Sequence, residues 1–181
     1  MALSILTATT HDVKHLATRY FFFGTLMDSD ILSVVLDRPV EAVRLTPARL
    51  NGYRRRRLAE DSYPMLLVDP AAAVDGVIFE SFGDHDDARI LFFEDYNYGL
   101  LPCRPVLVND ESTVDAMFCY AVDGTEASDE DWDLDVWAAT HKDGFIELSR
   151  RYMACFGRMT TQEAEPIWEA SRKQLMEEGR L

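Results

Sequence analysis

Short apolar stretches separated by turn-forming residues fill the first two thirds of the chain. These stretches are rich in β-branched and aromatic residues, which is typical of strands. The predicted strands cover residues 18–23, 43–58, 65–68, 74–79, 101–108 and 114–122. Asn51-Gly52 indicates a bend or bulge inside the second of them, and Asp69-Pro70 indicates a turn.

Two segments between these strands repeat their apolar residues at helical spacing instead. Residues 31–36 follow the acidic N-cap candidates Asp28 and Asp30, and residues 84–96 begin with several aspartates. Strands interrupted by short helices predict an α+β fold, which we interpret as a small mixed β-barrel.

The composition and pattern of the sequence change after residue 123. Residues 124–131 are acidic and small, and we interpret them as a linker. Aromatic and apolar residues then recur at helical spacing, with Asp143-Gly144 as a candidate break. A last helix starts either at Thr160, which forms a capping-box pattern with a later glutamate, or at Pro166.

These patterns divide the chain into three parts. Residues 1–17 are a weakly patterned N-terminal lead-in, residues 18–124 are the barrel domain, and residues 125–181 are a C-terminal helical extension that packs on the same domain.

Composition narrows the class of protein. The 181 residues are 48% hydrophobic, enough for one domain with a core, and carry a formal net charge of -14. Such a charge disfavours nucleic acid and anionic membranes as partners. No apolar stretch reaches the length of a membrane span, and the first ten residues lack the pattern of a signal peptide. We therefore expect a cytoplasmic protein.

The cysteines and histidines give no sign of a metal site. Cys103, Cys119 and Cys155 are an odd number without metal-type spacing, so we interpret them as free thiols in a reducing compartment. The four histidines have no ligand spacing either, and we predict no metal and no cofactor.

The segment that carries most information runs from Tyr20 to Met27, where an aromatic strand leads into a Gly-Thr-Leu turn. Two readings of the turn stay open. Gly24 provides a positive φ for a strand-to-helix connection. Alternatively, the backbone N–H groups of Gly24, Thr25 and Leu26 bind a carboxylate or a developing oxyanion.

Glu94 is the candidate acid. It follows an apolar run that includes Phe92 and Phe93, and burial there should raise the pKa of its carboxyl group. A surface role is the alternative, since glutamates on helices are usually solvated.

Two further sets of residues have ordinary explanations. The run from Arg54 to Arg57 reads as a charged edge strand, although one arginine could bind a carboxylate. Trp132, Trp137 and Trp168 read as core residues.

Taken together, these segments resemble the γ-glutamylcyclotransferase-like superfamily, in particular its AIG2-like branch. The resemblance runs in order from residue 20 to about residue 122. Its motifs are Phe21-Phe22-Phe23-Gly24-Thr25-Leu26-Met27, Ala48-x-Leu50-x-Gly52-Tyr53-Arg54, Tyr63-Pro64, Val74-x-Gly76-Val77, and Leu91-x-Phe93-Glu94 followed by Tyr98, Ala116 and Tyr120.

The resemblance implies a small mixed α/β barrel and a cofactor-independent reaction. In that reaction, 5-oxoproline is released from a small-molecule γ-glutamyl-amine or γ-glutamyl-amino acid. Glu94 matches the catalytic acid/base, and Phe23 to Leu26 match the turn that holds the substrate. Tyr98 and Tyr120 are expected to line the pocket.

Two positions depart from the family pattern. Phe23 stands where the family has a tyrosine, and Gly99 stands where an arginine or lysine is often found. Because a fold hosts more than one function, two alternatives stay open: a non-catalytic module that binds a carboxylate metabolite, and a related hydrolase or acyl-transfer enzyme. The oligomeric state does not follow from the sequence.

Overall fold

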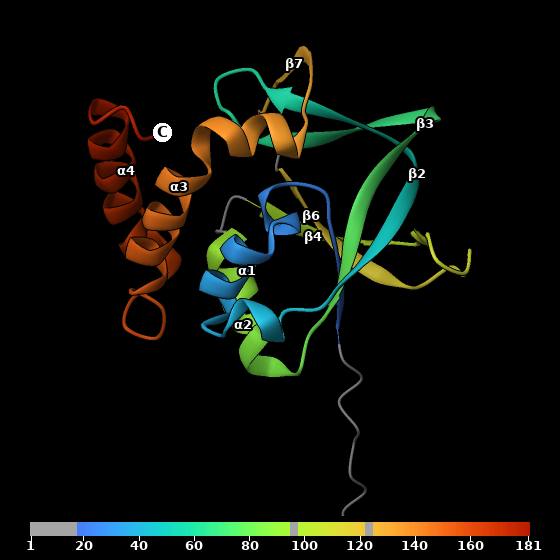
Figure 1. Ribbon diagram of the computed structural model, residues 1–181, viewed down its shortest axis with the longest axis horizontal. Coiled ribbons are helices and arrows are strands. Elements are labelled where there is room, and N and C mark those ends of the chain that lie inside the picture. The colour runs from blue at the N-terminus through green and yellow to red at the C-terminus, as the bar shows by residue number, and fades with distance from the viewer. Residues whose placement is uncertain (1–17, 95–97, 122–124) are drawn as a thin grey trace, which may run out of the picture.

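The computed structural model describes residues 18–94, 98–121 and 125–181, and it has the predicted α+β architecture (Figure 1). The strands are β1 (Arg19–Phe22), β2 (Leu45–Leu58), β3 (Pro64–Glu80), β4 (Tyr98–Cys103), β5 (Val106–Leu107), β6 (Ala116–Ala121) and β7 (Ala127–Asp131). The helices are α1 (Ser29–Leu36), α2 (Asp84–Glu94), α3 (Leu134–Met153) and α4 (Thr161–Glu177), with short 3-10 helices η1 (Thr25–Met27) and η2 (Val40–Ala42).

The strands form one mixed sheet in the order β4-β6-β1-β3-β2-β5, with β7 also paired to β2. Strand β1 lies inside it, antiparallel to β3 and parallel to β6. The pairings among the described strands form an open path, so the sheet is mixed as predicted but is not closed into a barrel. The predicted irregularity at Gly52 is present as a register shift between Asn51 and Tyr53.

Both faces of β1 are buried, which explains its unbroken aromatic sequence. Tyr20 and Phe22 belong to the main hydrophobic cluster, which the helices share. Phe21 points to the other face and joins a second cluster with Phe118 of β6. The helices gather on one side of the sheet, on the left in Figure 1, while the long β2–β3 hairpin crosses the other side.

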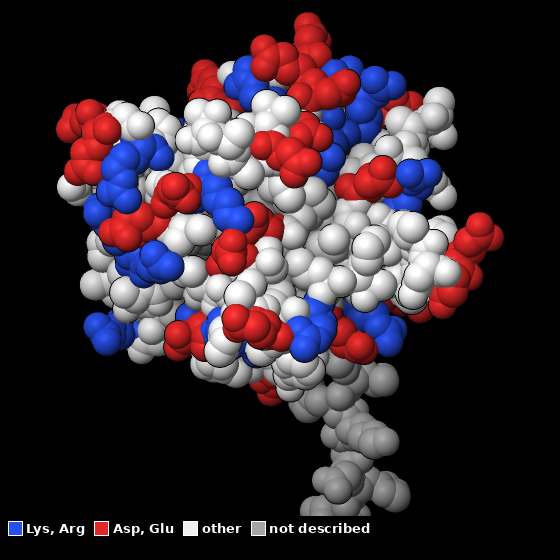
Figure 2. Space-filling view, viewed as in Figure 1, with Lys and Arg blue, Asp and Glu red and all other residues white. Residues whose placement is uncertain are grey.

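The acidic segment predicted as a linker contains a strand, β7, that pairs with β2. Its carboxylates meet the arginine run: Asp131 pairs with Arg56 at 2.8 Å and Glu130 with Arg57 at 2.8 Å. Figure 2 shows acidic and basic side chains interleaved there, at the top of the molecule. These cross-strand charge pairs offset the low β propensity of aspartate and glutamate.

Helix α3 is continuous, so the predicted break at Asp143-Gly144 is wrong. Gly144 is needed for space: a Cβ there would overlap the backbone carbonyl of Arg180 near the end of the chain. Helix α4 begins at Thr161, directly after its N-cap Thr160. The side chains of Thr160 and Glu163 form the predicted capping box, and Pro166 lies inside the helix.

Candidate active site

A cavity of about 310 Å³ lies between the sheet and the helices. The end of β1 and the following turn form one wall, and the segment before β3 forms a second. Helices α2, α3 and α4 supply most of the rest, together with Leu58 at the end of β2 and Cys119 of β6. Pockets of about 300–1,000 Å³ are typical of small-molecule sites, so this cavity suits a small substrate.

The turn after β1 borders the cavity with Phe23, Gly24, Thr25 and Leu26. Gly24 has a φ of -126°, so the positive φ that one reading of the sequence required is absent. The reason for a glycine is space, because a Cβ at this position would lie 2.9 Å from Cγ of Pro64.

The hydrogen bonds of this turn use its carbonyl groups. The carbonyl oxygens of Gly24 and Thr25 accept hydrogen bonds from the N–H groups of Met27 and Asp28, at 2.9 and 3.0 Å. Between described residues, no recorded hydrogen bond has the N–H of Gly24, Thr25 or Leu26 as its donor. These three N–H groups are the ones that the second reading of the sequence gives to an anion.

Arg55 of β2 fixes the turn after β1 through hydrogen bonds to backbone carbonyl groups. Its Nη1 donates to the carbonyl oxygen of Phe23 at 2.9 Å and its Nε donates to that of Trp132 at 3.1 Å. The guanidinium also stacks over the Trp132 ring, 5.1 Å from its centroid. Burial lowers the pKa of Arg55, while nearby aspartates, Asp133 first among them, raise it. Because its Nε and Nη1 groups donate to backbone carbonyls, Arg55 fixes the turn.

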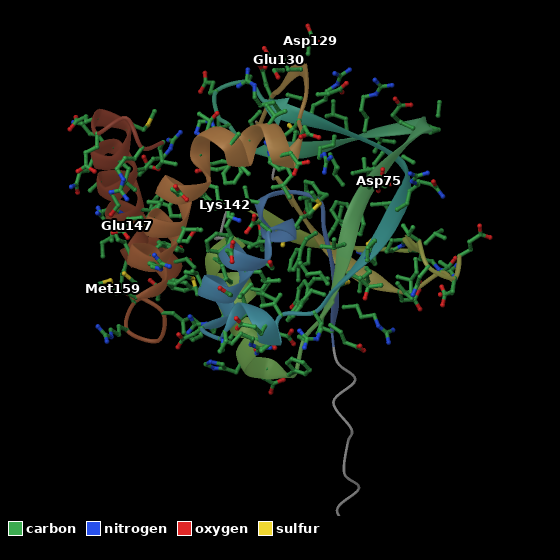
Figure 3. All side chains as sticks on the ribbon, viewed as in Figure 1. Asp75, Asp129, Glu130, Lys142, Glu147 and Met159 are labelled. Atoms are coloured by element: carbon green, nitrogen blue, oxygen red, sulfur yellow. The ribbon has the colours of Figure 1, made fainter. Side chains whose placement is uncertain are left out.

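Helix α3 is tied to the same region. Lys142, labelled in Figure 3, reaches from α3 to the start of α1, where its Nζ lies 2.7 Å from carboxylate oxygens of both Asp28 and Asp30. Asp28 also caps α1 by accepting hydrogen bonds from the backbone of Asp30 and Ile31.

Glu94 is the last residue of α2 and lines the cavity. Burial raises the pKa of its carboxyl group to about 7, which confirms the direction expected from its apolar neighbours. The thiol of Cys119, on β6, donates a hydrogen bond to Glu94 and pulls that pKa partly back. Burial and the carboxylate raise the pKa of Cys119, so the thiol keeps its proton.

Five aromatic side chains form the helix side of the cavity, and we call them the aromatic wall: Tyr63, Phe93, Phe145, Tyr152 and Trp168. Each ring in this group lies against another. Trp168 of α4 has centroid distances of 6.0 Å to Phe145 and 5.3 Å to Tyr152, both edge-on. Tyr63 lies 5.4 Å from Phe145.

The structure brings most of the predicted site residues together. Phe23 to Leu26 and Glu94 all line the cavity, and the Phe23 ring also packs edge-on against Phe118. Tyr98 opens β4, where its backbone pairs with Ala121, but its side chain lies outside the described part of the structure.

Tyr120 is not brought to the cavity. Neighbouring residues of a strand point to opposite faces, and it is Cys119 that lines the cavity, while Tyr120 is 36% exposed. The Tyr120 ring covers Gly99 on the paired strand, where a Cβ would meet the ring. A larger residue at Gly99, such as the arginine or lysine of the family pattern, would displace Tyr120.

Sequence reasoning missed Cys119, Phe145, Trp168 and Glu169 as lining residues. Alternation along β6 would have placed Cys119 opposite Tyr120, but it does not show which face holds a cavity. Trp132 and Trp137 support the site indirectly: their indole N–H groups donate to the carbonyl and hydroxyl oxygens of Ser62, next to the aromatic wall.

The three cysteines are free thiols, as predicted, and all three are buried. Among the described residues, no group of histidine, cysteine and carboxylate side chains is placed to hold a metal ion. Within the same residues, no helix has the length and apolar character needed to cross a membrane.

Comparison with known proteins gives consistent matches. Residues 20–137 match the family described as gamma-glutamyl cyclotransferase, AIG2-like. Protein AIG2 C from Arabidopsis thaliana is 23% identical over 134 residues, which span 74% of this chain and 79% of that protein. AIG2-like protein A, from the same plant, is 26% identical over 137 residues, 75% of this chain and 81% of that protein.

Solved structures share the fold. The solution structure of an Arabidopsis thaliana protein superposes with a TM-score of 0.57 and 21% identity, covering 80% of this chain and 96% of its own. The structure of a protein named gamma-glutamyl cyclotransferase superposes with a TM-score of 0.52 and 10% identity, covering 85% and 99%.

Proposed function

Because this chain belongs to the gamma-glutamyl cyclotransferase, AIG2-like family, we propose that it releases 5-oxoproline from a small γ-glutamyl substrate. In this reaction the α-amino nitrogen of the glutamyl group attacks its own side-chain amide carbon. The new ring C–N bond replaces the amide C–N bond, and the amine leaves. No water is consumed and no cofactor is required.

The reaction needs one group that moves a proton. An ammonium nitrogen has no lone pair for attack, so a base takes a proton from the attacking nitrogen. The leaving nitrogen then receives a proton as the amide bond breaks. Glu94, in its charged form, takes the first proton and in its neutral form returns it.

The observation that carries this proposal is the pKa of Glu94, which burial raises to about 7 inside the cavity. A carboxyl group poised near neutral pH serves as both base and acid. The turn at Gly24 supports the proposal, since its N–H groups suit the substrate carboxylate or the oxyanion of the tetrahedral intermediate. Ring closure is intramolecular, so a cavity that holds the substrate bent contributes to the rate.

The test is release of 5-oxoproline from a panel of γ-glutamyl amines and γ-glutamyl dipeptides, with Glu94→Gln beside the wild type. We expect the substitution to lower kcat by about 10²- to 10⁴-fold, the usual contribution of a general acid/base, without loss of substrate binding. Because Glu94 acts as a base only when deprotonated, kcat/KM should rise with pH through about 7.

Other products would identify the other functions. Release of glutamate in place of 5-oxoproline would indicate a hydrolase. Binding of the panel without any product, and with Glu94→Gln indistinguishable from wild type, would indicate a binding module.

A further inference from the structure

The charges that line the cavity are of one sign. Asp61, Glu94 and Glu169 are acidic, and none of the described lining residues is a lysine, arginine or histidine. The charge of Asp61 is matched by Arg172 of α4, whose Nη2 lies 3.0 Å from the carboxylate. Glu169 is exposed as well as lining the cavity, and no ion pair or hydrogen bond joins it to another described residue.

A γ-glutamyl dipeptide carries two carboxylates, one on the glutamyl group and one on the departing amino acid. Under the proposed function, the N–H groups of the turn at Gly24 are suited to the first. The described part of the lining offers no cation for the second, and Glu169 would repel it. A buried charge without a partner is costly, and like charges at a site cost more.

In place of a cation, the aromatic wall offers apolar contacts to the leaving group. Its five rings come from the segment before β3 and from α2, α3 and α4. Phe93 directly precedes Glu94 in the chain, and its ring lies 6.2 Å from Phe145 and 6.3 Å from Trp168. A leaving group that departs beside Glu94 therefore meets aromatic faces and edges, which favour apolar and aromatic groups.

From this arrangement we infer that the enzyme selects γ-glutamyl amides of apolar or aromatic amines that lack a carboxylate, and discriminates against γ-glutamyl dipeptides. The inference rests on the proposed function and narrows its substrate class. Trp168 and Glu169 are the residues that set the preference: the first by contact with the departing amine, the second by repulsion of a carboxylate.

The test uses two compounds that differ by a single carboxylate, γ-glutamyl phenethylamide and γ-glutamylphenylalanine. We expect kcat/KM for the amide to exceed that for the dipeptide by at least about tenfold, the effect of an uncompensated like charge. A third compound, γ-glutamyl ethylamide, lacks the ring and should be a poorer substrate than the phenethylamide.

Variants of α4 test which residues set the preference for the amide over the dipeptide. Glu169→Lys should raise kcat/KM for the dipeptide and leave the phenethylamide nearly unchanged. Trp168→Ala should lower kcat/KM for the phenethylamide by about 10- to 100-fold, as for lost apolar contacts in a pocket, and affect the ethylamide much less. Trp168→Phe should retain most of the preference, and Lys173→Ala, elsewhere on α4, is the matched control.

Binding to Glu94→Gln separates this inference from the proposed function. Tighter binding of the phenethylamide than of the dipeptide supports the inference whether or not the wild type is active. Equal or tighter binding of the dipeptide overturns it. Absence of 5-oxoproline from all three compounds overturns the proposed function alone.

Discussion

At the scale of single residues, the site depends on a carboxyl group and a thiol that share one hydrogen bond. Glu94 is held near a pKa of 7 by burial, which favours the neutral form, against Cys119, which favours the charged form. Cys119 is a positioning residue in this pair, since its own pKa is raised and it remains a donor.

Cys119→Ala removes the donor and should raise the pKa of Glu94 further. The base is then protonated over a wider range, so the rise of kcat/KM with pH should move to a value above about 7. Activity at high pH should be largely retained. The measurement is a pH profile of 5-oxoproline release.

Cys103→Ala is the matched control, because Cys103 is also a buried thiol but belongs to the second hydrophobic cluster. Its profile should coincide with that of wild type. If both variants shift the profile equally, or neither does, the thiol of Cys119 does not tune Glu94.

Sequence predicted Glu94 and the turn because their signals are local: an acid after two phenylalanines, and a glycine after an aromatic strand. Cys119 could not be found in this way, since its role depends on pairing between β4 and β6 and on the position of α2. Tyr120 was assigned to the pocket by family resemblance, and the alternation of the strand turns it to the other face.

At the scale of elements, the four successive arginines of β2 have different roles, set by the partners that each side chain meets. Arg54, Arg56 and Arg57 form ion pairs with Asp69, Asp131 and Glu130. Arg55 is turned inwards, where it binds the carbonyl groups of Phe23, Trp132 and Asp75.

Arg55→Met should therefore destabilise the fold and impair catalysis, whereas Arg54→Met should do little. Loss of charged, part-buried hydrogen bonds to carbonyl groups costs about 1–3 kcal/mol in the free energy of unfolding, against about 0–1 kcal/mol for an exposed ion pair. Urea unfolding gives the first quantity, and kcat/KM reports the position of the turn. Equal effects of the two substitutions would contradict the assigned role of Arg55.

The elements that were predicted wrongly from the sequence are those stabilised by residues far away in the chain. The acidic segment 127–131 reads as a linker until the arginines of β2 are placed opposite to it. Asp69-Pro70 reads as a turn, yet β3 continues through it, with the pairing stepping from Ala73 to Val68 across Gly52. Local propensity predicted the strands and helices whose own residues form the core, such as β1 and α1.

At the scale of the whole molecule, the end of the chain returns to α3. Leu181 packs against the main hydrophobic cluster, and the carbonyl group of Arg180 occupies the space that a side chain at residue 144 would need. This contact lies on the helix that contributes Phe145 and Tyr152 to the aromatic wall.

Gly144→Ala should lower Tm, because the chain end must move to accommodate the methyl group, at a cost of about 1–3 kcal/mol. A chain shortened to end at Gly179 should tolerate the same substitution or gain up to about 1 kcal/mol, since alanine favours a helix over glycine. Thermal unfolding of the full and shortened chains, each with glycine or alanine at residue 144, measures the coupling between residue 144 and the chain end. Additive effects would show that the contact with Arg180 does not restrict residue 144.

The family match ends at residue 137, whereas Phe145, Tyr152, Trp168 and Glu169 come later in the chain. The residues proposed for proton transfer thus lie inside the family match. Much of the proposed selectivity for the amine comes from residues after it. Substitutions confined to these later residues would therefore change the preferred amine while Glu94 and the turn at Gly24 stay the same.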